Sequence, residues 1–117
     1  MSDDDMDEVM AELRGQFVAS LPDHTAAIRQ AWQTLGGGGA PSARRAAADE
    51  LLRRAHRLSG NGAMVGFAAI SDAASPVEEM LRAVLDADKS IALPAELGSL
   101  VSKLLELCED ASGRDAR

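Results

Sequence analysis

His56 is the residue of this chain whose surroundings best suit nucleophilic chemistry. Leu51, Ala55 and Leu58 recur at helical spacing and therefore share one face of a helix. At about 100° per residue, His56 lies roughly 130° from the centre of that face, so we expect the imidazole on the shoulder of the helix and outside the core. A neutral imidazole is a nucleophile near pH 7 because its unperturbed pKa is about 6.5.

The turns on either side of the histidine suit an approaching protein surface. Ser59 and Gly60 follow it and are small, so nothing bulky is expected on that side of the imidazole. The preceding turn supplies an apolar and a cationic side chain. The residues expected to contact a partner are Leu52, Arg53, Arg57 and Ala63.

The stretch Ala55-His56-x-Leu58-x-Gly60, with a further glycine at Gly66 and then a long amphipathic helix, resembles the histidine-containing phosphotransfer (HPt) domain of bacterial phosphorelays. The resemblance covers about residues 20–85. It implies that His56 accepts a phosphoryl group from the aspartate of a receiver domain and passes it to another receiver. The family usually has a lysine three residues after the histidine, where this chain has Ser59.

The resemblance also implies a role for Glu78 of the following helix, and Arg82 on the same helix offers a further hypothesis. Glu78 occupies the polar position near the histidine, where it can hydrogen-bond the proximal ring nitrogen and leave the distal one free. Arg82 can replace the missing lysine by reaching the phosphoryl oxygens. Ordinary solvent exposure is the alternative for both side chains, and a kink at Pro76 would move either one.

Basic residues are concentrated on the helix that carries the histidine. From residue 42 to 63 the balance is about +3, within a chain whose net charge is −7. Such a face would attract the cluster of carboxylates around the phosphorylatable aspartate of a receiver domain. The alternative is that these arginines only form a solvent-exposed helix face, because arginine has a high helix propensity. The charges concerned are Arg44, Arg45, Arg53, Arg54 and Arg57 against Asp49 and Glu50.

Composition predicts one all-α domain spanning residues 1–117. Alanine and leucine abound and β-branched residues are few. The charge of −7 argues against nucleic acid and anionic membranes as partners, and no apolar run approaches the roughly 20 residues of a membrane span. The acidic N-terminus is unlike a secretory signal, and Cys108 is the only cysteine. We therefore expect a cytoplasmic monomer with no metal or cofactor of its own. The resemblance to HPt domains implies that its partners are receiver domains carrying Mg²⁺ and a (hybrid) histidine kinase.

Apolar periodicity predicts an antiparallel up-down four-helix bundle preceded by a short capping helix near residues 6–17. The second helix is expected to begin at 20–23, with Ser20 as its cap and Pro22 in its first turn. The run 36–39 is a flexible connection, and Ser42 is the expected cap of the third helix. Pro76 is expected to kink the fourth helix, residues 88–90 to close it, and Pro94 to lie near the start of the last. Residues 1–5 and 112–117 are expected to be mobile.

Other residues that could carry chemistry have simpler interpretations. His24 has no second ligand at a suitable spacing, so we expect it on the surface and predict no metal site. Met64 and Met80 are expected to fill the core. Two alternatives to the phosphocarrier stay open, a helical adaptor that binds a kinase or receiver without being phosphorylated, and a phosphatase acting on a receiver.

Overall fold

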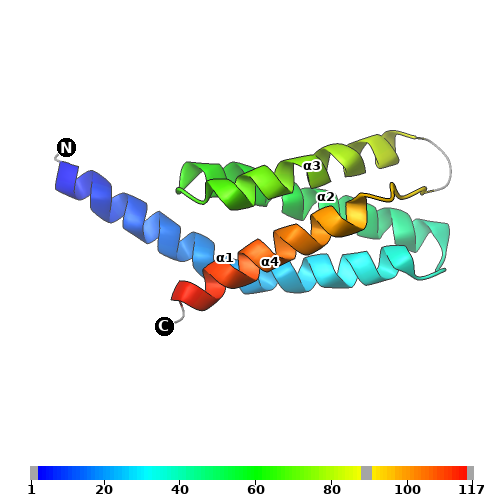
Figure 1. Cartoon of the computed structure of the whole chain (residues 1–117), viewed down its shortest axis with the longest axis horizontal. Helices are drawn as coiled ribbons and strands as arrows, with labels where there is room; N and C mark the ends of the chain where they lie inside the picture. Colours follow the sequence, from blue (N-terminus) through cyan, green and yellow to red (C-terminus); the bar gives the residue numbers. More distant parts are fainter. Residues whose placement is uncertain (1–2, 88–90, 116–117) are drawn as a thin grey trace.

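The described residues form four helices, and each packs antiparallel to the next (Figure 1). The computed structural model describes residues 3–87 and 91–115, and within these ranges it contains no strand. The all-α bundle expected from the sequence is therefore confirmed. The helices are α1 (Asp3–Gly36), α2 (Pro41–Met64), α3 (Ala68–Asp86) and α4 (Leu97–Asp115).

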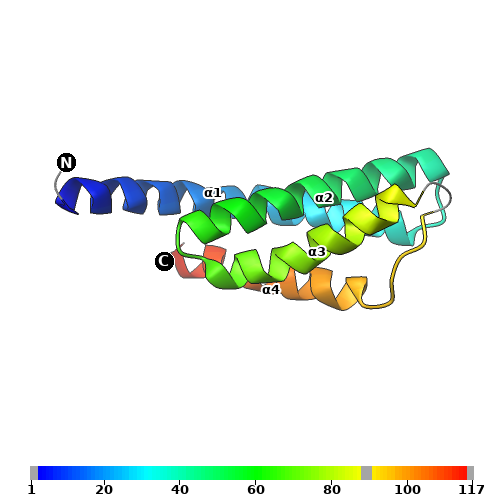
Figure 2. The ribbon, with the colours of Figure 1, turned by 90° about the horizontal axis from the view of Figure 1, so that it is seen from above.

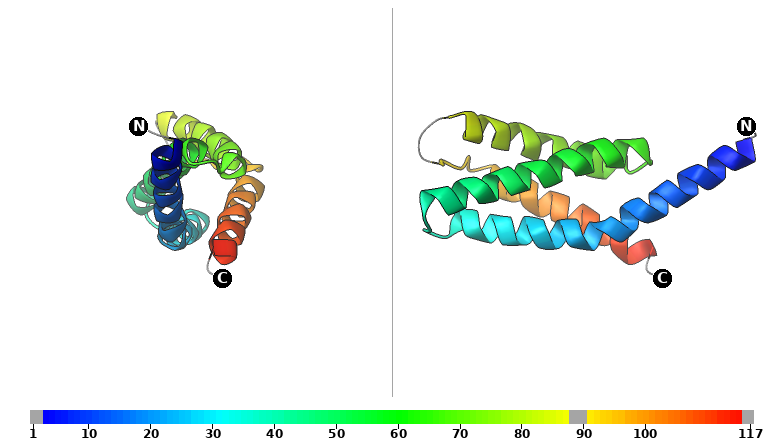
Figure 3. Two further views of the ribbon diagram at one scale, coloured as in Figure 1. Left: turned by 90° about the vertical axis from the view of Figure 1, so that its left-hand side faces the viewer. Right: turned by 180° about the vertical axis from the view of Figure 1, so that it is seen from behind.

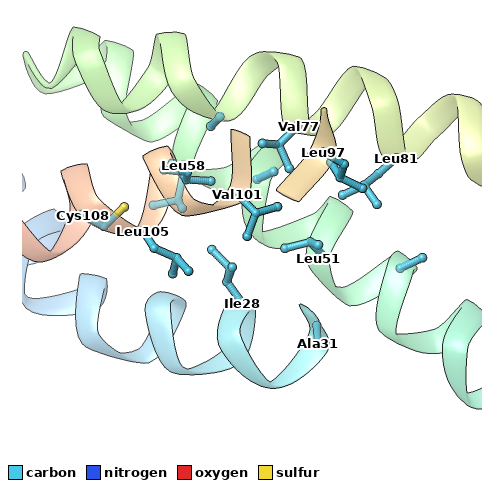
Figure 4. Close-up of a cluster of buried hydrophobic side chains, with 14 of the residues drawn as sticks. Ile28, Ala31, Leu51, Leu58, Val77, Leu81, Leu97, Val101, Leu105 and Cys108 are labelled. Atoms are coloured by element: carbon cyan, nitrogen blue, oxygen red, sulfur yellow. The ribbon is translucent and has the colours of Figure 1, made fainter. Parts of the chain in front are cut away.

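The helices follow one another around a shared apolar core. α1 packs against α2 and α4, and α3 packs against the same two helices, with the α2–α3 pair in the most extensive contact (Figure 2). Figure 4 shows the side chains that meet in the centre. Full burial of one leucine or isoleucine stabilises a fold by about 1.5–3 kcal/mol. The fully buried large side chains include Leu21, Ile28, Leu51, Leu58, Ile70, Leu81, Leu97 and Leu104.

The predicted capping helix was wrong, because α1 is one helix of 34 residues that runs through Pro22. A proline inside a helix costs about 3 kcal/mol, since it removes one hydrogen bond and crowds the carbonyl four residues earlier. The apolar stripe nevertheless continues across it, with Phe17, Leu21 and Ile28 all buried. Burial of these side chains offsets the cost, and Ser20 lies within the helix instead of capping it.

α1 also runs along nearly the whole length of the molecule. At about 1.5 Å per residue its 34 residues span roughly 51 Å, against a longest extent of 54 Å for the whole chain. Figure 1 shows α1 changing direction near its middle, as an internal proline favours. Its N-terminal part extends past the ends of the other helices (Figure 3, right).

α2, which carries His56, is bounded by a proline and a glycine. The expected cap at Ser42 was wrong: Ala40 is the N-cap without a side-chain hydrogen bond, and Pro41 occupies the first turn. Proline suits that position because its fixed φ is already helical and its missing N–H has no partner to lose. Just beyond the C-terminal end, Gly66 adopts φ +92°, a backbone conformation that other residues rarely reach.

The remaining boundaries differ from expectation in smaller ways. Pro76 lies inside α3 without ending it, and the kink expected there stays a prediction. The predicted closure at 88–90 falls outside the described residues, while α3 ends at Asp86. Residues 3–5 and 112–115 are helical, and the mobility expected of the two ends stays a prediction. Within the described ranges, no helix combines the length and apolar character that crossing a membrane requires.

Candidate functional site

His56 stands on the outer side of α2, facing α3. Its side chain is 70% exposed, and its Nδ1 atom lies 2.9 Å from Oε2 of Glu78, which is only 13% exposed. The interface between the two helices fixes this approach, because Ala55 and Val77, the immediate neighbours of the pair, are fully buried. The imidazole is therefore accessible while the carboxylate is held beneath it.

The same carboxylate oxygen serves a second donor. Arg82, one turn further along α3, donates from Nη2 to Oε2 of Glu78 over 2.7 Å. Because a carboxylate only accepts hydrogen bonds, the neutral His56 ring carries its proton on Nδ1. The lone pair then belongs to Nε2, which has no hydrogen-bond partner among the described residues.

Ser59, at the position of the usual lysine, is part of the contact between α2 and α3. Its Oγ lies 2.9 Å from Oγ of Ser75, which also hydrogen-bonds the Ser71 carbonyl over 3.0 Å. The Ser71 hydroxyl in turn donates to the Ser59 carbonyl over 2.7 Å. These three hydroxyls tie the two helices together beside His56, and Ser59 offers no charge there.

Small residues keep the surface next to the imidazole open. Gly60 and Ala63 are both exposed, and a Cβ placed on Gly60 would meet no atom within 4 Å. Gly62, by contrast, is buried, and a Cβ there would lie 3.3 Å from the carbonyl oxygen of Phe67. Gly62 was not among the expected site residues, although its spacing from Leu58 places it on the buried face of α2.

A shallow depression lies beside the imidazole. Its volume is about 250 Å³, and it joins residues of α2 with one residue of α3. Four of the expected site residues and the histidine itself meet here, whereas Ala63 lies one turn further on and does not line it. The lining residues are Leu52, Arg53, His56, Arg57 and Arg82.

Most arginines of α2 are already engaged by carboxylates or carbonyls. Arg53 and Arg54 both bind Glu50, and Arg54 also binds Asp23 of α1. Arg44 and Arg45 donate to backbone carbonyls of Leu35 and Leu85. Arg57 has no hydrogen bond or ion pair among the described residues. The unneutralised positive charge near His56 is thus smaller than the arginine count suggests.

The expectation of a surface position for His24 was wrong. The residue is 7% exposed, and its Nδ1 lies 3.2 Å from Nη1 of Arg54. Desolvation lowers the pKa of His24, and the guanidinium of Arg54 lowers it further. The spacing from Leu21 to Ile28 includes position 24, so the helical period already indicated a buried site. Met64 also differs from expectation, since it is exposed.

No group of three or more His, Cys, Asp and Glu side chains is placed to hold a metal ion within the described part of the chain. Cys108 is buried in the core, and this desolvation raises the pKa of its thiol to about 12. The thiol is therefore protonated near neutral pH and inert as a nucleophile.

A comparison with models of protein families assigns most of the chain to a known family. The family model described as the Hpt domain matches residues 12–112, which includes both helices of the site. No curated protein and no solved structure matches the chain. Since the family model spans most of the sequence, the chain belongs to the Hpt domain family.

Proposed function

We propose that this protein relays phosphoryl groups between the aspartates of receiver domains through a phosphohistidine at His56. Membership of the Hpt family supports a general role in histidine phosphotransfer within phosphorelays. The observation that carries the assignment to one residue is the exposed imidazole, whose Nδ1 is held by Glu78 while Nε2 has no hydrogen-bond partner in the described part of the chain. His24, the other histidine, is buried and paired with Arg54.

The proposed step is an in-line displacement on phosphorus. The Nε2 lone pair of His56 attacks the acyl phosphate, a P–N bond forms, the P–O bond to the aspartyl oxygen breaks, and the carboxylate leaves with the electron pair. The ring becomes cationic because Nδ1 keeps its proton, and the carboxylate of Glu78 stabilises that charge. The reverse step on a second receiver regenerates the neutral ring.

Charge neutralisation is shared with the partner. Mg²⁺ bound by the receiver domain would stabilise the phosphoryl oxygens during transfer. On this chain, Arg82 is exposed and close to the imidazole through Glu78, so its guanidinium can turn toward the phosphoryl group. Arg82 is the proposed substitute for the lysine absent at Ser59.

The proposed docking surface surrounds the depression beside His56. Leu52 supplies an apolar contact, and Arg57, which forms no ion pair with any residue of the ranges 3–87 and 91–115, supplies the main attraction for an acidic receiver. Gly60 and Ala63 leave the approach open. Receiver domains and a hybrid histidine kinase are the proposed partners, met in the cytoplasm.

Transfer of label from a phosphorylated receiver tests the proposal. The chain is mixed with a receiver domain carrying radiolabelled aspartyl phosphate, and the label on this chain is tested for lability to acid and stability to base. We expect labelling of the wild type and of His24→Gln, and none of His56→Gln. Absence of label from the wild type with every cognate receiver, or retention in His56→Gln, would contradict the assignment.

One observation favours the alternative of a non-phosphorylated adaptor. Residue 59, where the family usually has a lysine, is a serine, so the chain has no cation at this position. The Ser59 hydroxyl is instead hydrogen-bonded with Ser75. An adaptor would bind the receiver with equal affinity in the wild type and His56→Gln, and neither would take up label. Binding measured in the same reactions therefore separates the two functions.

A further inference from the structure

Large exposed apolar side chains gather at one end of the bundle. Within the described residues they are Met6, 55% exposed, Val9, 45% exposed, and Met64, 63% exposed. The first two lie on the part of α1 that extends past the other helices (Figure 3, right), which we call the overhang, residues 5–13. Apolar side chains grouped in this way mark an interaction surface more often than single exposed ones do.

The overhang leads into a groove between α1 and α2. The groove has a volume of about 400 Å³, and Leu13, the last residue of the overhang, lines its entrance. Its walls are apolar near Met64 and polar further along, toward the buried His24. The lining residues are Leu13, Gln16, Phe17, Ser20, His24, Arg57, Asn61, Met64 and Val65.

The spacing along α1 suits a second helix running in the opposite direction. Met6, Val9 and Leu13 are separated by three and then four positions, which is the seam of a two-helix coiled coil. Continuing the pattern gives positions 16 and 20, both of which line the groove. Two copies paired antiparallel about residue 11 place Val9 of one against Leu13 of the other, and Met6 against the groove wall at Gln16.

Charge favours the same arrangement. The overhang carries Asp5, Asp7, Glu8 and Glu12 and no basic residue, whereas the groove contains Arg57, which makes no hydrogen bond or close ion pair among the described residues. Antiparallel pairing brings the acidic end of each overhang to the groove of the other copy. Parallel pairing would stack the two acidic segments and is disfavoured.

We propose that two copies of this chain form a symmetric dimer in which the overhang of each lies in the α1–α2 groove of the other. The contact is the same on both copies, so it closes on itself and needs no third molecule. The proposed dimer differs from the monomer expected from the sequence, and the experiments below decide between them. The proposal does not depend on phosphotransfer, although Arg57 also borders the depression beside His56, so the dimer contact reaches the edge of that site.

Molar mass in solution tests the dimer directly. Light scattering after size exclusion, from micromolar to millimolar concentration, should rise toward twice the 12.3 kDa mass of one chain. Val9→Glu should remain monomeric, because it buries a carboxylate in the seam. Ala11→Glu adds the same charge about 160° around the helix from Val9 and should still dimerise. A monomeric wild type throughout, or equal behaviour of the two variants, would overturn the proposal.

Cross-linking tests the direction of pairing. A mixture of Val9→Cys and Leu13→Cys proteins should form disulfide-linked dimers faster than either variant alone, because the antiparallel register places these two positions opposite each other. Cys108 is buried and can be retained. Faster cross-linking of Val9→Cys alone would indicate parallel pairing and overturn the register, and a circular dichroism spectrum would verify that each variant is folded.

Discussion

Nδ1 of His56 lies 2.9 Å from Oε2 of Glu78, and these two residues come from the pair of helices with the most extensive contact in the bundle. The contact fixes which ring nitrogen keeps the proton and therefore which one is available for chemistry. It also makes Glu78 a positioning residue that acts through the histidine, and several of the predictions below follow from that arrangement.

Glu78→Gln should slow phosphotransfer to His56 by about tenfold. The amide still accepts a hydrogen bond from Nδ1, but it no longer stabilises the positive charge that develops on the ring, a loss of about 1.4 kcal/mol. Rates are measured by transfer of label from a phosphorylated receiver. Glu79→Gln is the matched control, because Glu79 is the exposed neighbour and should retain the wild-type rate. Equal rates for the two variants would contradict a role for Glu78.

Arg82→Ala should lower the same rate by about three- to tenfold, because one cation near the phosphoryl oxygens is lost. Adding Ser59→Lys to this variant should restore part of the rate by returning a cation to the usual family position. Arg29→Ala removes an exposed arginine paired with Glu109 between α1 and α4 and should leave the rate unchanged. Failure of Ser59→Lys to rescue would show that Arg82 does not substitute for the missing lysine.

Two glycines near the site should respond to alanine with opposite signs. Gly66 has φ +92°, so Gly66→Ala should destabilise the fold by about 1–2 kcal/mol. Gly60 lies inside α2 with open space around it, so Gly60→Ala should stabilise by about 0.5–1 kcal/mol. Urea unfolding measures both free energies. Destabilisation by Gly60→Ala would mean that the open space beside His56 is occupied.

The stability of the fold should fall as the pH drops below about 6.5, partly because of His24. Burial and Arg54 lower the pKa of this histidine from its usual 6.5, so the unfolded chain binds more protons than the folded one across that range. The loss continues until the pH reaches the lowered pKa of the folded state. Thermal melts between pH 7.5 and 5 give the melting temperature as a function of pH for the wild type and for His24→Gln. The melting temperature of the variant should fall less over this range. Parallel slopes would contradict the prediction.

At more acidic pH, the dependence of stability on pH comes from carboxylates and no longer from His24. Hydrogen bonds from Arg54 lower the pKa values of both Asp23 and Glu50, so these carboxylates favour the folded state above their unfolded pKa values. That contribution is lost at lower pH than the His24 effect. Below the lowered pKa of His24, the variant should keep its advantage over the wild type, and the two melting temperatures should fall in parallel as the pH drops further.

The sequence predicted the parts of the fold that depend on periodic burial. Leu51, Ala55 and Leu58 are buried as their spacing indicates, and the exposed position of His56 follows from the same helical phase. The contact with Glu78 could be expected only from the family resemblance, because it depends on how α2 and α3 are rotated against each other. The sequence alone does not determine that rotation.

The errors arose where residue type was given more weight than period. Pro22 by itself favours a helix start, but the apolar stripe continues across it within α1. His24 by itself favours a surface position, but it lies within the same stripe and is buried. Met64 was expected in the core because of its side chain, but it lies at the end of α2, where the bundle opens. In each case tertiary packing overrode the preference of a single residue.

His56 and Glu78 are 22 positions apart in the sequence and belong to a single helical hairpin. Contacts at short sequence separation need little loop closure, so this hairpin can assemble early when the chain folds and open late when it unfolds. The chemistry of the protein is thus located in one helical hairpin, while α1 and α4 complete the core around it. Fluctuations that loosen either outer helix can therefore leave the acceptor and its carboxylate paired.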